Sequence, residues 1–175
     1  MRRQSGFTLI ELATTAAIAV ILAGVATPAL GGFIERQRAA ATTSALMAKI
    51  SLARLSAVTH HRHTVLCASA SGSDCDQGSR DWSGGWMLFF DDNGNRRRDV
   101  GEEVLRVEQA GGGPLRVVTT RGRPQLRYQP DGSSAGSNLT ISICSPRGTV
   151  LGTVVVNNMG RPRSERPRTE RTCPA

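Results

Sequence analysis

The chain contains very little lysine, few aromatic residues and no CxxC pair. Lys49 is the only lysine among 22 basic residues, and aromatic residues make up 4% of the 175 positions. So few aromatic side chains argue against base stacking as the main mode of binding to a nucleic acid. The spacing of the four cysteines argues against a structural zinc site. We therefore expect neither a metal nor another cofactor.

The sequence also lacks a recognisable arrangement of nucleophile, base and acid. Its serines lie in turn clusters, and His60, His61 and His63 lie together near the expected end of a helix. A metal site would need further converging ligands, which the sequence does not indicate. We therefore expect that the protein is not an enzyme.

Arginine is abundant, and the formal net charge is +8. Because the guanidinium group binds phosphate through two parallel hydrogen bonds, this excess is compatible with an anionic partner. A GC-rich genome would produce the same bias without any function.

The N-terminal segment combines a positively charged start with a long apolar run. Arg2 and Arg3 precede it, and Glu11 is the only ionisable residue from Phe7 to Phe33. As a helix, this run would be roughly 40 Å long, which exceeds the roughly 30 Å of a hydrocarbon core. A cleaved secretory signal is the alternative, but no convincing cleavage site follows. We therefore expect a single transmembrane span at residues 7–33, with its start on the cytoplasmic side.

Glu11 is unusual within this apolar run, because a carboxylate in such a helix is costly and normally has a partner. Cleavage of the chain after Gly6 would create a new α-amine at Phe7, one helical turn from Glu11. An ordinary membrane anchor leaves this acidic residue unexplained.

Beyond the apolar run, the pattern predicts an amphipathic helix at residues 34–62 and a β-rich head at residues 63–175. Leu46, Ile50, Ala53 and Ala57 recur at helical spacing. Short apolar segments separated by turn residues then predict antiparallel strands. The expected fold class is α+β, a long N-terminal helix packed on an antiparallel β-sheet head. The expected strands cover residues 64–69, 85–91, 103–110, 115–120, 125–130, 138–145 and 149–158.

An even number of cysteines behind a membrane-targeting start indicates disulfides in an oxidising compartment. Cys67 and Cys75 flank a short loop, so we expect them to pair, which leaves Cys144 with Cys173. Four cysteines allow three pairings, so this connectivity is a hypothesis. A bridge from Cys144 to Cys173 would hold the C-terminal segment against the head.

The C-terminal segment is rich in arginine. Gly160 permits a sharp turn, after which Arg161 and Arg163 can project along one side of a loop toward phosphate oxygens. A solvated basic tail, interrupted by Glu165 and Glu170, is the alternative. Three more arginines extend the basic track: Arg166, Arg168 and Arg171.

The segment DDNGNRRRDVGEE, residues 91–103, superficially resembles a calcium loop. An EF-hand has its glycine at position six, and counting back from Gly94 places Phe89, which cannot be a ligand, at position one. We therefore expect a hairpin turn with Asn93 and Gly94 in left-handed conformations. Arg96, Arg97 and Arg98 at its tip are either a second anion contact or a solvated turn.

The segment GFTLIEL, Gly6 to Leu12, resembles the class III signal of type IV pilins and type II secretion pseudopilins. The resemblance implies that residues 1–6 are a leader that prepilin peptidase removes after Gly6, and that Phe7 is then N-methylated. It also implies that Glu11 pairs with the N-terminal amine of a neighbouring pilin subunit. The subunit would wait in the inner membrane, with its head in the periplasm, before it enters a filament.

The head resembles the GspH/FimT group of minor pilins and pseudopilins. Trp82, Gly85 and Trp86 match its W-x-x-G-W element, and Gly160, Arg161 and Arg163 match the GRxR element of DNA-binding FimT-type pilins. The resemblance implies a minor pilin that binds extracellular DNA, without sequence specificity, for uptake in natural transformation. The scarcity of aromatics favours duplex DNA. The alternative is a purely structural subunit, either a GspH-type pseudopilin of type II secretion or a minor pilin that primes assembly.

Overall fold

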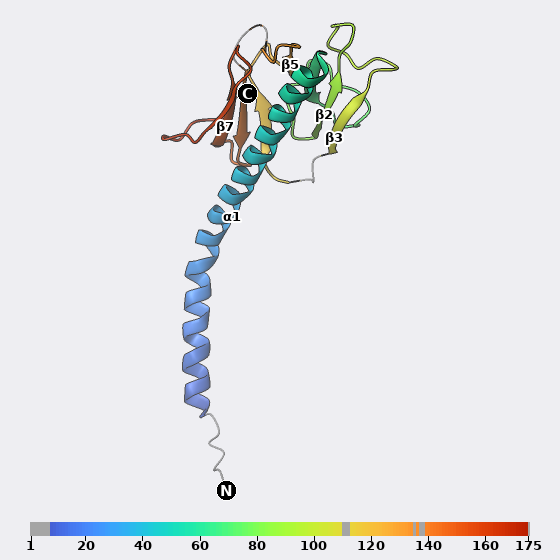
Figure 1. The fold of residues 1–175 in the computed structure, drawn as a ribbon. Helices are drawn as coiled ribbons and strands as arrows, with labels where there is room; N and C mark the ends of the chain where they lie inside the picture. The colour runs from blue at the N-terminus through green and yellow to red at the C-terminus, as the bar shows by residue number, and fades with distance from the viewer. Residues whose placement is uncertain (1–7, 110–112, 135, 137–138, 175) are drawn as a thin grey trace. The chain divides into compact units, whose positions relative to one another are not determined.

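Figure 1 shows the computed structural model, which describes residues 8–109, 113–134, 136 and 139–174, with backbone alone at residues 25–29. The chain divides into two compact units, Met1–Gln37 and Arg38–Ala175. One long helix, α1 (Leu9–His60), precedes the strands. The strands are β1 (Thr64–Ala68), β2 (Gly85–Phe90), β3 (Val104–Gln109), β4 (Arg116–Thr119), β5 (Gln125–Tyr128), β6 (Leu139–Cys144), β7 (Val150–Val156) and β8 (Pro162–Glu165).

The N-terminal unit consists of the first half of α1 and exposes apolar side chains. The Glu11 amide donates to the Thr8 hydroxyl at 3.3 Å, so Thr8 caps the helix. The exposed apolar residues include Leu9, Ile10, Leu12, Ile18, Val20, Ile21 and Leu22. Within the described part of the chain, no helix combines the length and apolar character required to cross a membrane. The transmembrane span expected at residues 7–33 stays a prediction.

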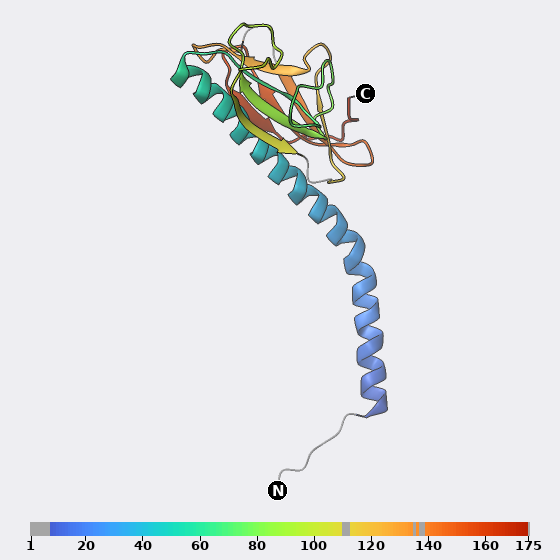
Figure 2. The ribbon, with the colours of Figure 1, turned by 90° about the vertical axis from the view of Figure 1, so that its right-hand side faces the viewer.

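The second half of α1 supplies one side of the head's core. Leu46, Ile50, Ala53 and Ala57 are fully buried, as their helical spacing predicts. Complete burial of a leucine or isoleucine side chain contributes about 1.5–3 kcal/mol. The two alanines add little volume, so the strands can approach the helix closely there. Figure 2 shows this half of α1 along one side of the strands.

The strands form two antiparallel sheets. Sheet 1 has the order β3-β2-β1-β5, and sheet 2 has the order β4-β6-β7-β8. Residues from both sheets, including Leu126 of β5 and Ile141 of β6, join the helical stripe in one hydrophobic cluster. The expected α+β class, a helix packed on an antiparallel β head, is confirmed.

The expectation that the chain forms a loop from Gly160 onward is wrong for one segment. Residues Pro162–Glu165 form strand β8, which pairs antiparallel with β7, so that Val155 lies opposite Arg163. Without β8, β7 would present an unpaired row of backbone groups at the edge of sheet 2. Pro162 lacks an N–H donor but is the first residue of the strand, a position where proline is tolerated.

The expected disulfide connectivity is present. Cys67 is bonded to Cys75, and Cys144 is bonded to Cys173. The second bridge joins β6 to the C-terminal segment, across a sequence separation of 29 residues.

Replacing Cys144 and Cys173 together by serine should lower the free energy of unfolding by roughly 3–4 kcal/mol, because the bridge closes a loop of about 30 residues. It should also make the backbone after Arg168 and Arg171 more accessible to trypsin. Urea unfolding and timed tryptic digestion with mass spectrometry would measure both effects. The matched Cys67→Ser/Cys75→Ser variant should leave cleavage after these arginines at the parent rate. Equal tail cleavage in the parent and in the Cys144/Cys173 variant would show that the bridge does not hold the segment.

Candidate nucleic-acid interface

The arginine-rich segment begins with the turn between β7 and β8. Gly160 has a φ of 74°, in the left-handed region that favours glycine. Its amide donates to the Asn157 carbonyl oxygen at 2.8 Å, and the Arg161 amide donates to the Asn157 side-chain oxygen at 2.9 Å. These bonds fix the direction in which the chain enters β8.

Gly160 is buried, and it holds the turn rather than offering a side chain to a ligand. A Cβ atom at this position would collide with the Gly132 carbonyl oxygen and lie 2.7 Å from the Tyr128 ring. The fully buried Tyr128 hydroxyl donates to the Gly160 carbonyl oxygen at 3.0 Å, and burial raises the pKa of that hydroxyl. The sequence indicated the need for glycine but gave no signal for the role of Tyr128.

Arg161 and Arg163 are both exposed, and they lie two residues apart. In an extended strand this spacing would direct both side chains to the same face, but only Arg163 lies within β8. Glu165 shares that face, and its carboxylate lies 2.8 Å from Arg163 Nε. With 68% of Arg163 and 49% of Glu165 exposed, such an ion pair is weak. A phosphate would therefore compete with Glu165 for Arg163.

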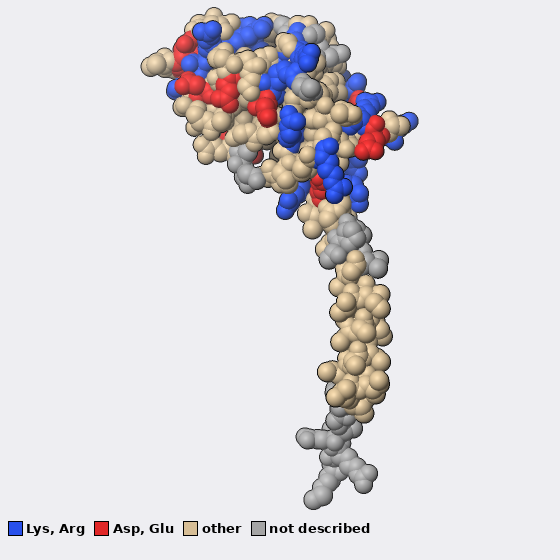
Figure 3. All heavy atoms as spheres, turned by 180° about the vertical axis from the view of Figure 1, so that it is seen from behind, with Lys and Arg blue, Asp and Glu red and all other residues tan. Residues whose placement is uncertain are grey.

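Arg166, Arg168 and Arg171 are exposed too, but the backbone around them is held to the head. The Val150 amide donates to the Arg171 carbonyl oxygen at 2.9 Å, and the Cys173 amide donates to the Gly148 carbonyl oxygen at 2.7 Å. Since Arg161 lies beside the end of β7 and Arg171 beside its start, the arginines extend over roughly 20 Å of one sheet edge. Seen from behind, the head shows many basic residues, with acidic residues between them (Figure 3).

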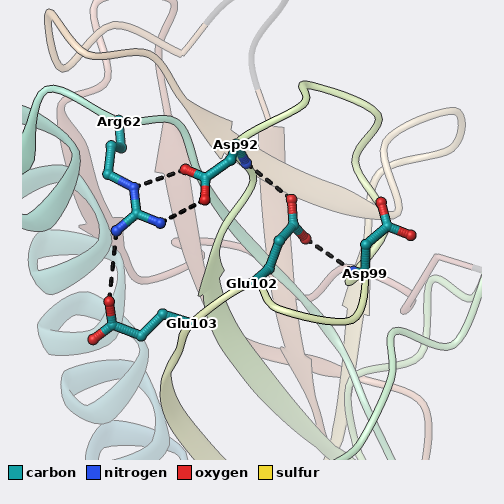
Figure 4. Close-up of polar contacts among 5 residues, drawn as sticks. All are labelled: Arg62, Asp92, Asp99, Glu102 and Glu103. Carbon is teal, nitrogen blue, oxygen red and sulfur yellow. Dashed lines mark hydrogen bonds and ion pairs between the residues drawn. The ribbon is translucent and has the colours of Figure 1, made fainter.

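The loop between β2 and β3 carries a separate polar network (Figure 4). Arg62 Nε and Nη2 donate to the two Asp92 carboxylate oxygens at 2.7 and 2.6 Å, and Arg62 Nη1 lies 3.5 Å from Glu103. The hydrogen bond from Arg62 lowers the pKa of Asp92. The Glu102 carboxylate accepts the amides of Asp92 and Asp99, both at 2.9 Å. These contacts fix the loop against the end of α1.

This loop is not the simple hairpin turn that the sequence predicts. The residues with positive φ are Gly94 (76°), Arg96 (63°) and Gly101 (97°), and Asn93 is not among them. The Arg96 amide donates to the buried Asp91 carboxylate at 3.2 Å, which stabilises this unusual conformation.

The loop can also be aligned with an EF-hand so that Asp91 takes position one. With Arg96 at the sixth position, where an EF-hand has glycine, positions 1, 3, 5, 9 and 12 are Asp91, Asn93, Asn95, Asp99 and Glu102. In the structure, however, the Asp91 and Glu102 oxygens accept the loop's own amides. Among the described residues, no three His, Cys, Asp or Glu side chains form a group that could hold a metal ion.

The predicted processing residues are only partly described. Gly6 and Phe7 lie outside the described residues, and Glu11 is exposed in the first turn of α1. His60 packs edge-on against Phe90, with 5.2 Å between ring centroids, so it contributes to packing at the end of the helix.

The sequence patterns of two families match this chain. The family described as type II transport protein GspH matches residues 42–160, and the prokaryotic N-terminal methylation motif matches residues 1–27. Pilin-like protein PilA1 of Thermus thermophilus is 29% identical over 165 residues, which cover 91% of this chain and 97% of that protein.

The fold is similar to that of a solved pilin. Two crystal structures of the type IV minor pilin FimU of Pseudomonas aeruginosa have TM-scores of 0.62 and 0.58, with 19% and 20% identity. They cover 81% and 78% of this chain and 98% of each FimU chain. At this level of identity, the likeness establishes the fold alone.

Replacing Gly160 by alanine should lower the free energy of unfolding by about 2 kcal/mol or more, because it combines a left-handed φ with a collision against Gly132. Tyr128→Phe should lower the free energy of unfolding by about 1–2 kcal/mol, because it removes the hydroxyl that donates a hydrogen bond to the buried Gly160 carbonyl oxygen. Thermal and urea unfolding would measure both. Gly148→Ala is the control for the left-handed backbone conformation alone. Gly148 has a φ of 82°, but a Cβ atom added there would have no other atom within 4 Å. If Gly160→Ala were no more destabilising than Gly148→Ala, the close packing of this turn would be refuted.

Proposed function

Because this chain belongs to the GspH/FimT group of type IV minor pilins and pseudopilins, we propose that it assembles into a type IV pilus and binds extracellular DNA for uptake in natural transformation. The observation that supports DNA binding is the set of arginines presented along one fixed edge of sheet 2. It is a structural and binding role rather than an enzymatic one.

The N-terminal unit would serve assembly. Prepilin peptidase removes the leader after Gly6, Phe7 is methylated, and Glu11 pairs with the N-terminal amine of a neighbouring subunit. The methylation motif matched at residues 1–27 and the exposed position of Glu11 support this proposal. The exposed apolar side chains from Leu9 to Leu22 support it too, because such a surface is stable only when other molecules cover it. Before assembly the subunit is held at the inner membrane with its head in the periplasm, and afterwards it lies in the pilus.

The head would bind DNA through the phosphate backbone, without reading sequence. Arginine side chains on a sheet edge can donate charge-assisted hydrogen bonds to phosphate oxygens. Such contacts position a protein on DNA but carry no sequence information. Such binding weakens steeply with salt, because each neutralised phosphate releases condensed counterions. The fixed backbone of residues 160–173 reduces the ordering cost that a free tail would have on binding.

The second candidate function is a structural pseudopilin of a type II secretion system. The matched family description, type II transport protein GspH, favours it. Glu165 and Glu170 also interrupt the basic edge, as expected for a surface that has no polyanion to bind. The two functions differ in whether the isolated protein binds DNA.

Arg161→Gln with Arg163→Gln should weaken binding to a labelled duplex by about tenfold at low salt, and should reduce the slope of log K against log[salt] by about 1.8. Fluorescence anisotropy of the full chain in non-ionic detergent, over a series of salt concentrations, would measure both.

Glu165→Gln is the opposite control for this experiment. It removes the carboxylate that competes for Arg163 and should tighten binding, whereas a surface with no DNA contact would respond to neither change. If the double arginine variant binds as the parent does, this site is wrong. If the parent does not bind DNA, the pseudopilin function is favoured.

Glu11→Ala should leave leader removal by prepilin peptidase intact and strongly reduce incorporation into filaments, since the partner of the neighbouring amine is lost. Glu11→Gln should give a similar loss, because it keeps the shape of the side chain but removes its charge. N-terminal sequencing and quantification of the subunit in sheared pili would test this. Normal incorporation of both variants would show that the Glu11 carboxylate is not needed for assembly.

A further inference from the structure

The turn that precedes β8 has a counterpart elsewhere in the head. Gly122-Arg123-Pro124, in the loop after β4, repeats the sequence Gly160-Arg161-Pro162. Both glycines have a φ of 74°. Thus the chain builds two turns with the same residues and the same left-handed glycine, each followed by an arginine.

Both turns emerge from the same end of sheet 2. Thr119, the last residue of β4, lies opposite Ile141, and Val156, the last residue of β7, lies opposite Leu139. Both strands therefore end beside the start of β6, which lies between them. Two strand spacings place these ends about 10 Å apart.

A fully buried aromatic side chain anchors each turn. The Tyr128 hydroxyl donates to the Gly160 carbonyl oxygen, and the Trp82 indole N–H donates to the Pro124 carbonyl oxygen, both at 3.0 Å. The Arg123 amide also donates to the Thr120 carbonyl oxygen at 3.1 Å, which closes the second turn. Both turns are therefore held before any ligand arrives, which lowers the entropy lost on binding.

The outer face of sheet 2 connects the two turns. Arg163 lies opposite Val155, which lies opposite Thr140. Residues that pair across a sheet share a face, so Arg163 and Thr140 point to the same side. The Thr120 amide and hydroxyl both donate to the Thr140 carbonyl oxygen at 3.0 Å. Arg121, the next residue, therefore follows the cross-strand series Arg163, Val155 and Thr140 at its β4 end.

The arginines of the second turn line two cavities at this end of the sheet. Exposed Arg121 lines an open cleft of about 500 Å³ together with Arg80, Thr120, Thr140, Ser142 and Pro174. Half-buried Arg123 lines a smaller cavity of about 200 Å³ that also includes Arg96 and Arg127. Ser134 borders this smaller cavity, and its amide donates to the Asn158 carbonyl oxygen in the first turn at 3.0 Å. A backbone hydrogen bond therefore links the border of the smaller cavity to the first turn.

We propose that Arg121 and Arg123 form, together with Arg161 and Arg163, one phosphate-binding rim that holds a DNA duplex across the end of sheet 2. This inference rests on the proposed DNA-binding function and adds a second contact to it. The grooves of a duplex are roughly 6–12 Å wide, so two turns about 10 Å apart can reach phosphates of the same duplex. Contacts to phosphate carry no sequence information, which agrees with binding without sequence specificity.

The test compares four proteins by fluorescence anisotropy with a labelled duplex, as full chains in non-ionic detergent. They are the parent, Arg121→Gln/Arg123→Gln, Arg161→Gln/Arg163→Gln, and the control Arg38→Gln/Arg106→Gln. The control loses the same charge, but Arg38 lies on α1 and Arg106 lies on β3 of sheet 1, so both are outside sheet 2. Each rim variant should bind about tenfold more weakly than the parent at low salt, with a salt slope smaller by about 1.8. The control should bind within about twofold of the parent.

The outcomes separate the two proposals. If the Arg161/Arg163 variant loses binding while the Arg121/Arg123 variant matches the control, the second contact is wrong and the proposed function stands. If the affinity of both rim variants for the duplex decreases no more than that of the control, the proposed rim is wrong and only net charge affects binding. If the parent does not bind the duplex, the proposed function fails and the rim fails with it. Equal thermal unfolding of all four proteins would show that lost affinity does not come from lost structure.

Discussion

The packing of the second half of α1 against both sheets is the contact on which the head depends. Sheet 1 and sheet 2 have no strand in common, and the hydrophobic cluster that contains Leu46 and Ile50 draws residues from each of them. Because the helix buries one continuous stripe against both sheets, it fixes the position of sheet 2, and with it the direction in which β7 ends. The arginine-bearing turns lie at that end, so their placement follows from the packing of an apolar helix face.

The basic surface shows how exposed charged residues can be given a defined geometry. An arginine side chain loses conformational entropy when it is ordered. An exposed ion pair such as that of Arg163 with Glu165 contributes too little stabilisation to offset this loss. The structure therefore orders the backbone rather than the side chains. The Cys144–Cys173 bridge, the pairing of β8 with β7 and the Tyr128 hydroxyl all act on main-chain positions. The side chains of Arg161, Arg163, Arg166, Arg168 and Arg171 stay exposed.

Expectations based on periodicity and on short-range chemistry were accurate. The helical stripe, the seven apolar strands and the two disulfides all follow from patterns that extend over a few residues or from pairing cysteines around a short loop. Strand β8 was missed because Pro162, Arg163 and Glu165 have no apolar alternation, and only the open edge of β7 makes them a strand. The loop at residues 91–103 was misjudged because Arg96, not an asparagine, takes a left-handed conformation. The hydrogen bonds from the Arg96 amide to the Asp91 carboxylate stabilise this left-handed conformation, and they depend on the fold of the whole loop.

The sequence by itself determined the family, the fold class, the disulfide partners and the residue types of the basic surface, because these depend on local composition and on spacing along the chain. Tertiary structure alone decided which arginines lie together. Arg121 and Arg161 are far apart in the sequence, yet the order β4-β6-β7 brings their turns to one end of a sheet. Sheet order and register come from long-range pairing and from burial against α1, so no short stretch of the chain contains that information.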